Sequence, residues 1–66
     1  MKIKWKKDPP GIIGLENGIP RFFIFESVLG GFGMTDQETE IVHRRMSIKA
    51  LESLAEKIVD SEEQDI

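Results

Sequence analysis

Apolar and polar residues alternate along much of the chain, and this alternation predicts β-strands. Between Lys2 and Lys6, Ile3 and Trp5 share one face while lysines occupy the other, which is the period of a half-buried strand. Residues 39–46 alternate in the same way. Residues 21–29 are apolar on both faces, as in strands that are covered on both sides. The pattern therefore predicts several strands, one of which needs two covering layers.

Turn-forming residues separate the predicted strands. The DPPG sequence at residues 8–11 ends the first strand, because each proline fixes φ and lacks a backbone N–H. Asn17 and Gly18 follow a short apolar run and suit the positive φ angles of a type I′ hairpin turn. A turn or linker is therefore expected at residues 8–11, and a hairpin at Asn17 and Gly18.

The glycine-rich residues 30–33 and the TDQE sequence after them are interpreted as a turn or bulge followed by a polar loop. The strands on either side would then form an antiparallel pair joined by a loop of about eight residues. Such pairing would bring Arg21 close to Arg45.

Residues 47–60 predict an amphipathic helix. Ser47 is a good N-cap, and Met46 and Leu51 have the spacing of a hydrophobic staple. The apolar residues recur at intervals of three and four, which is the helical period: Ile48, Leu51, Leu54, Ala55, Ile58 and Val59. The expected fold is α+β, a three- or four-stranded antiparallel sheet with one C-terminal amphipathic helix.

The chain has 66 residues and is expected to form a single small domain. Its expected parts are a basic strand and linker (1–10), antiparallel strands (11–46), the helix (47–60) and an acidic tail (61–66). The absence of cysteine excludes disulfides and leaves oligomerisation as the common way to stabilise so small a core. We therefore expect a homo-oligomer in which a second copy covers the second face of residues 21–29; the alternative cover is the N-terminal segment.

Charge and composition restrict the classes of partner that the chain is expected to bind. The net charge is −3, with lysines near the start and carboxylates near the end, so nucleic-acid binding is not favoured. No apolar run approaches the roughly 20 residues that span a bilayer, and we expect a cytoplasmic protein without membrane contact. With no cysteine and one histidine, we expect no metal and no cofactor.

Four cationic side chains form the most distinctive polar group, namely Arg21, His43, Arg44 and Arg45. His43 and Arg45 share one face of their predicted strand, Arg21 is expected beside them, and Arg44 lies on the opposite face. Two or three of these cations converging on a sheet surface would hold a phosphate, a carboxylate or an acidic patch of a partner; alternatively they pair with Glu26, Glu38 and Glu40 across the strands. No serine or cysteine nucleophile is placed to use His43. We therefore expect no enzymatic activity.

Two functions fit these patterns. The first is a small interaction module, a homo-oligomer that binds and modulates another protein. Its expected contact surface consists of Phe22, Phe23, Ile24, Phe25, Leu51, Leu54 and Ile58. The alternative is an oligomer that binds a small anionic, nucleotide-like ligand between phenylalanines, Trp5 and the arginines.

Two stretches resemble known families. RRMSIKALESLAEKI resembles the strand and first helix of the ribbon-helix-helix DNA-binding family, but only DSEEQDI follows Val59. The second helix of that family has no counterpart, so DNA binding is a minor alternative. Residues 21–63 also resemble short bacterial and phage proteins of unknown function, in which two strands lead through a serine or threonine cap into one helix. This resemblance implies a strand-strand-helix fold and no particular activity.

Overall fold

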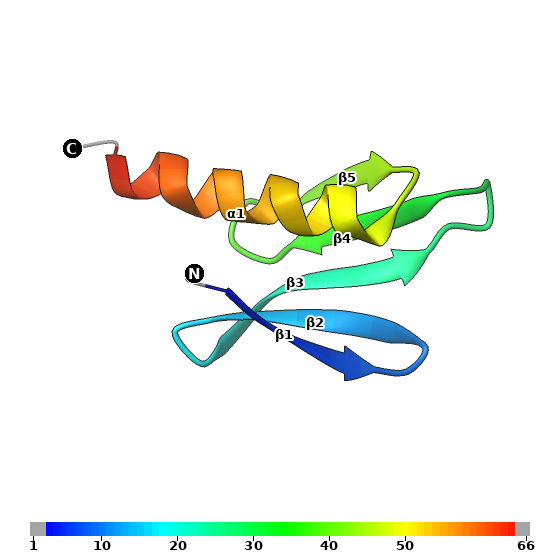
Figure 1. Ribbon diagram of the computed structural model, residues 1–66, viewed down its shortest axis with the longest axis horizontal. Helices are drawn as coiled ribbons and strands as arrows, with labels where there is room; N and C mark the ends of the chain where they lie inside the picture. Colours follow the sequence, from blue (N-terminus) through cyan, green and yellow to red (C-terminus); the bar gives the residue numbers. More distant parts are fainter. Residues whose placement is uncertain (1–2, 65–66) are drawn as a thin grey trace.

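The structure, a computed structural model, describes residues 3–64, which fold into five strands and one helix. The elements are β1 (Ile3–Asp8), β2 (Gly11–Glu16), β3 (Ile19–Glu26), β4 (Phe32–Asp36), β5 (Ile41–Arg45) and α1 (Ile48–Gln64). Within this range the strands form one antiparallel sheet in chain order, and α1 packs on β3, β4 and β5 (Figure 1). The predicted α+β class is confirmed, but the sheet has five strands rather than three or four.

The N-terminal strand lies at one edge of the sheet. Strand β1 pairs with β2 from Ile3 to Asp8, so this segment extends the sheet and does not fold across the second face of β3. Lys2 of the predicted strand lies outside the described residues. The turn between β2 and β3 was predicted correctly: Asn17 has φ 53° and Gly18 has φ 81°, and a type I′ turn needs both angles positive.

Strand β4 was not expected from the sequence. Phe32–Asp36 lies between β3 and β5 and pairs with both, so the predicted direct pairing of residues 21–29 with 39–46 is wrong. The turn before β4 uses Gly30 (φ 97°) and Gly31 (φ 71°), which are glycines because other side chains rarely adopt positive φ. Arg45 pairs with Phe32 and is not a neighbour of Arg21.

The helix begins where it was predicted and ends later. The Ser47 hydroxyl accepts a hydrogen bond from the Ala50 amide at 3.1 Å, so the N-cap is confirmed. Met46 is 81% exposed and does not form the predicted staple. The helix continues to Gln64, so the first residues of the predicted acidic tail are helical, while Asp65 and Ile66 lie outside the described residues.

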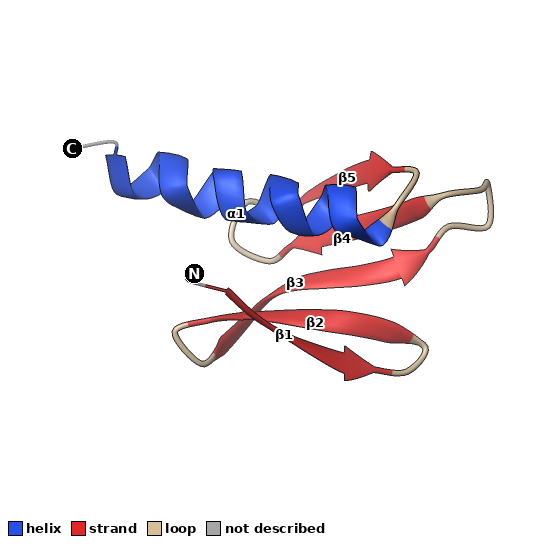
Figure 2. Cartoon of the chain, in the orientation of Figure 1, coloured by secondary structure: helices blue, strands red, loops and turns tan. Residues whose placement is uncertain are grey.

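The core lies between α1 and one face of the sheet, as the arrangement of the helix over β4 and β5 in Figure 2 indicates. Leu51, Ala55 and Val59, four residues apart on α1, are fully or almost fully buried. They pack against four buried strand residues, Ile3, Phe22, Ile24 and Met34. Burying a large apolar side chain contributes about 1.5–3 kcal/mol, so this interface supplies most of the apolar stabilisation.

Candidate functional site

A β-bulge turns Arg21 toward the helix. Gly14 pairs with Phe22 and Leu15 pairs with Pro20, so β3 has one more residue than β2 at this point. Strict alternation would place Arg21 on the face of Phe23, but a bulge redirects the side chain. As a result Arg21 lies beside Phe22, with its guanidinium carbon 4.9 Å from the ring centroid.

The Arg21 guanidinium is held by three carboxylates from three elements. Nε and Nη2 donate to the two oxygens of Asp36 at 2.9 and 3.1 Å. Nη1 and Nη2 donate to the two oxygens of Glu62 at 2.8 and 2.7 Å, and Nη1 also donates to Glu16 at 3.0 Å. An arginine has five N–H donors, and all of them are used. We call Arg21, Asp36, Glu62 and Glu16 the Arg21 cluster.

The electrostatics of the cluster favour the ionised forms. Burial raises the pKa of Asp36, but hydrogen bonds from Arg21 and from the Glu38 amide, together with the charge of Arg21, outweigh it and the net shift is downward. The hydrogen bond from Arg21 also lowers the pKa of Glu62. Conversely, the bonds to Glu62 and Asp36 raise the pKa of Arg21. Each partner therefore stabilises the charge of the other.

The cluster is an anchor for the C-terminal part of α1. The last turn of the helix contains no basic residue, although a cation there would stabilise the helix dipole. Arg21, reaching Glu62 from β3, supplies that cation from the sheet. With every Arg21 donor already bonded within the described chain, the predicted role of Arg21 in anion binding is not supported by the geometry.

Stability is expected to fall in acid. The folded pKa values of Asp36 and Glu62 lie below their ordinary values, so the unfolded chain binds more protons and unfolding is favoured as these groups titrate. Their contribution is complete above the ordinary carboxyl values, about 3.9–4.3, and is lost as the pH falls below them. The urea midpoint, measured by circular dichroism from about pH 7 to about pH 3, should drop below about pH 4.5.

The control for this experiment is another carboxylate of the same helix. Glu62→Gln should flatten the acid dependence, because one of the two shifted groups is removed, whereas Glu52→Gln, outside the Arg21 cluster, should leave it unchanged. Equal slopes for the wild type and Glu62→Gln would contradict the assignment.

The remaining predicted cations are divided between the two faces of β5, as the sequence pattern predicted. Met34 pairs with His43 and Phe32 pairs with Arg45, which places both on the side of the sheet that faces α1. Arg44 alternates to the opposite side. Arg44 therefore lies opposite His43 and Arg45, as expected, whereas Arg21 is not beside Arg45, because β4 lies between β3 and β5.

The predicted partner surface is divided between the core and the opposite face. Phe22, Ile24 and Leu51 are 0%, 2% and 0% exposed, so their assignment to a partner surface is corrected: the chain buries them itself. Leu54 and Ile58 are half-buried and pack against the core. Phe23 and Phe25 alternate with Phe22 and Ile24 along β3 and therefore point away from α1. On that face Phe23 pairs with Ile13, and Phe25 pairs with Gly33.

The sheet face turned away from α1 is apolar at its centre, and residues 3–64 provide no layer to cover it. Phe25 is 40% exposed and Val42 is 54% exposed, and three further apolar side chains on this face are half-buried. We call this surface the open face and define its apolar centre as Ile13, Leu15, Phe23, Phe25 and Val42.

Glycine allows one aromatic ring of the open face to lie flat on the sheet. A Cβ atom at Gly33 would lie within about 3 Å of the Phe25 ring, closer than van der Waals contact permits. Beside the apolar centre, a hollow of about 420 Å³ is lined by β1, β2 and the start of β3. Sequence reasoning missed Ile13, Leu15 and Val42 as members of this surface. Their signals were the short apolar run that contains Ile13 and Leu15, and the presence of Val42 on the same face as Arg44.

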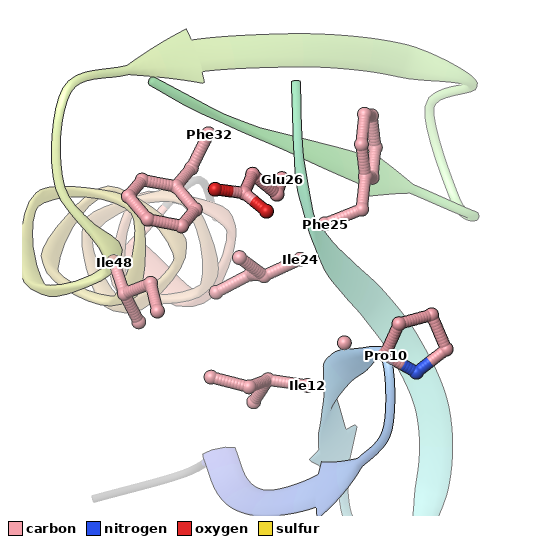
Figure 3. Close-up of a pocket in the computed structure, with 8 residues that line it drawn as sticks. Pro10, Ile12, Ile24, Phe25, Glu26, Phe32 and Ile48 are labelled. Carbon is pink, nitrogen blue, oxygen red and sulfur yellow. The ribbon is translucent and has the colours of Figure 1, made fainter. Parts of the chain in front are cut away.

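A second hollow opens on the side of the sheet that carries α1. Ile12, Ile24, Phe32 and Ile48 line it, as Figure 3 shows, and its volume is about 440 Å³. Glu26 is the charged group that lines this hollow. A single exposed carboxylate without a second acid or base offers no acid–base pair for catalysis.

The described residues contain neither a metal-binding group nor a membrane-spanning helix. Among the described residues, no group of three or more histidine, cysteine, aspartate or glutamate side chains is arranged to hold a metal ion. The part of the chain from residue 3 to residue 64 contains no helix that is both long and apolar enough to cross a membrane. Searches against protein-family models, curated proteins and solved structures find no match to this chain.

Proposed function

We propose that this chain is a small non-enzymatic interaction module that binds another protein through its open face. The observation that carries the proposal is the apolar centre on the face opposite α1, where Phe25 and Val42 remain exposed. An antiparallel sheet with one solvated face normally places polar residues there. Contiguous exposed apolar surface on a small domain marks a binding site.

The anionic-ligand alternative has less support. It requires arginines that converge and have free donors, but Arg21 donates all its N–H groups to carboxylates. Arg44 and Arg45 lie on opposite faces of β5. The interaction module needs neither condition, because apolar contact area and aromatic side chains provide most of the binding energy in protein interfaces.

The test is a paired substitution at the exposed edge of the apolar centre. Phe25→Ser/Val42→Ser should lower the free energy of unfolding by only about 1–2 kcal/mol, since both side chains are partly exposed. It should weaken binding to a captured and purified partner by about tenfold or more, because aromatic interface residues often contribute over 1 kcal/mol each. Isothermal titration calorimetry with the purified partner measures the change.

A matched control uses exposed apolar residues elsewhere. Val28 and Leu29, in the loop between β3 and β4, are 100% and 76% exposed, so Val28→Ser/Leu29→Ser removes similar side chains outside the open face. Loss of binding in this variant, with binding retained in the Phe25/Val42 variant, would place the contact at the loop and contradict the proposal.

Self-association is measured separately. Native mass spectrometry of the purified chain reports whether a second copy covers the open face, as the homo-oligomer expectation requires. A dimer that the Phe25→Ser/Val42→Ser variant dissociates would identify a second copy as the occupant. If the wild type and the variant are both monomers, no second copy covers the open face, and the occupant is another protein.

A further inference from the structure

We infer that the partner presents an amphipathic helix to the open face, with an apolar stripe flanked by carboxylates. This inference rests on the proposed function and concerns the chemistry of the partner. Its basis is the placement of charge around the apolar centre and the shape of the helix that already covers the other face.

Cations border the apolar centre at both edges of the sheet. Lys4 pairs with Leu15 and Lys6 pairs with Ile13, so both lysines lie on the open face at the β1 edge. Arg44 pairs with Gly33 and lies on the same face at the β5 edge. Asp8 is the one carboxylate that this alternation places there.

The opposite side of the molecule is acidic. The chain carries a net charge of −3 although its open face is cationic, so negative charge is concentrated elsewhere, including along α1. That helix carries five carboxylates and two lysines, namely Glu52, Glu56, Asp60, Glu62 and Glu63 with Lys49 and Lys57. A separation of this kind orients an approaching acidic surface toward the open face and away from α1.

An amphipathic helix can pack on a face of this sheet, since α1 already packs on the face opposite the open face. Leu51, Ala55 and Val59 form a stripe that packs on the other face, with Glu52 and Glu56 beside it. A second helix on the open face would produce the three-layer arrangement in which both faces of a sheet are covered. Figure 1 shows α1 along β4 and β5. The proposed helix would lie on the other face of the sheet, over the apolar centre, most of which is on β2 and β3.

A second copy of the chain does not meet these requirements. Its own α1 cannot supply the stripe, because Leu51, Ala55 and Val59 are buried in its core. Two open faces packed with aligned strands would bring each cationic edge against a cationic edge, since both edges carry positive charge. Nucleic acid fits less well, because the centre of the face is apolar and the cations stand at its borders.

Two synthetic helical peptides test the inference. Both have the same leucine stripe, flanked by glutamates in one and by lysines in the other, and binding is followed by fluorescence anisotropy. The glutamate peptide should bind at least about tenfold more tightly at low salt, since three cations each contribute modestly. In about 0.5 M salt the ratio should approach one because the charges are screened.

Adjacent arginines supply the matched control. Arg44→Glu should reduce the preference for the glutamate peptide severalfold, whereas Arg45→Glu, on the other face of the same strand, should leave it unchanged. An equal effect of both substitutions, or a preference for the lysine peptide, overturns the inference. Arg44-dependent binding to anionic phospholipid vesicles or a DNA duplex, with neither peptide bound, also overturns it.

The two proposals can fail independently. If both peptides bind equally and Phe25→Ser/Val42→Ser abolishes binding of both, the open face is a protein-binding surface and only the charge selection is wrong. If the purified partner binds normally to that variant, the proposed function itself is wrong, whatever the peptides do.

Discussion

Replacing Arg21 with methionine is expected to lower the free energy of unfolding by about 3–5 kcal/mol, the usual cost of breaking a buried ion pair from one side. Asp36 is fully buried and would lose its charged partner, while Glu62 would lose its contact with the sheet. A domain of this size has a total stability of only about 3–10 kcal/mol. The variant should therefore lose at least about a third of the stability of the domain.

A second substitution keeps this prediction testable if the single variant does not fold. Arg21→Met/Asp36→Leu removes both buried charges, and replacing a buried ion pair by apolar side chains is often neutral. The double variant should recover most of the lost stability. Arg21→Lys should fall between the wild type and Arg21→Met, because lysine keeps the charge but cannot make the two forked contacts.

Urea unfolding followed by the fluorescence of Trp5 measures these differences. Trp5 packs against the core and its ring centroid lies 6.2 Å from that of Phe22, so its emission should change on unfolding. A loss below about 1 kcal/mol for Arg21→Met, the value typical of exposed ion pairs, would show that the Arg21 cluster does not anchor the helix.

The Arg21 cluster could not be read from the sequence, for a physical reason. The alternation of β3 assigns Arg21 to the face of Phe23, and only the bulge at Arg21, between the Gly14–Phe22 and Leu15–Pro20 pairs, reverses it. Bulges depend on the register of two strands, which a single strand pattern does not contain. Glu62, expected in an acidic tail, becomes a partner only because the helix extends past residue 60.

Strand β4 was missed because a buried carboxylate interrupts its pattern. Phe32 and Met34 alternate as in any strand, but Asp36 occupies the next core-facing position. Read without its partner, an aspartate between threonine and glutamine indicates a loop. Local features were easier to predict than strand β4. The Asn17-Gly18 turn and the Ser47 cap depend on neighbouring backbone atoms only, and both predictions are confirmed.

The open face was foreseen only in part. The sequence shows that residues 21–29 are apolar on both sides, but it does not say which side the helix covers. The structure places Phe22 and Ile24 under α1 and leaves Phe25 exposed. Ile13 and Val42 join the same surface because their strands pair with β3 and β4, a consequence of strand order that no individual segment specifies.

Leu51→Ala is expected to lower the free energy of unfolding by about 2–5 kcal/mol, the range for a leucine truncated in a packed core. Leu51 is 0% exposed and belongs to the cluster between α1 and the sheet. Leu54, one turn further along and half-buried at the margin of that cluster, provides the matched control. Leu54→Ala should cost clearly less, because fewer contacts are lost and solvent reaches the site.

The concentration dependence of this loss tests where Leu51 is buried. The core that contains it forms within one chain, so the urea midpoint of Leu51→Ala should be the same at protein concentrations about a hundredfold apart, as expected for unfolding without dissociation. A midpoint that rises with concentration would mean that a second chain completes the pocket around Leu51. In that case the partner surface predicted from the sequence, which includes Leu51, would describe the protein better than a core formed within one chain.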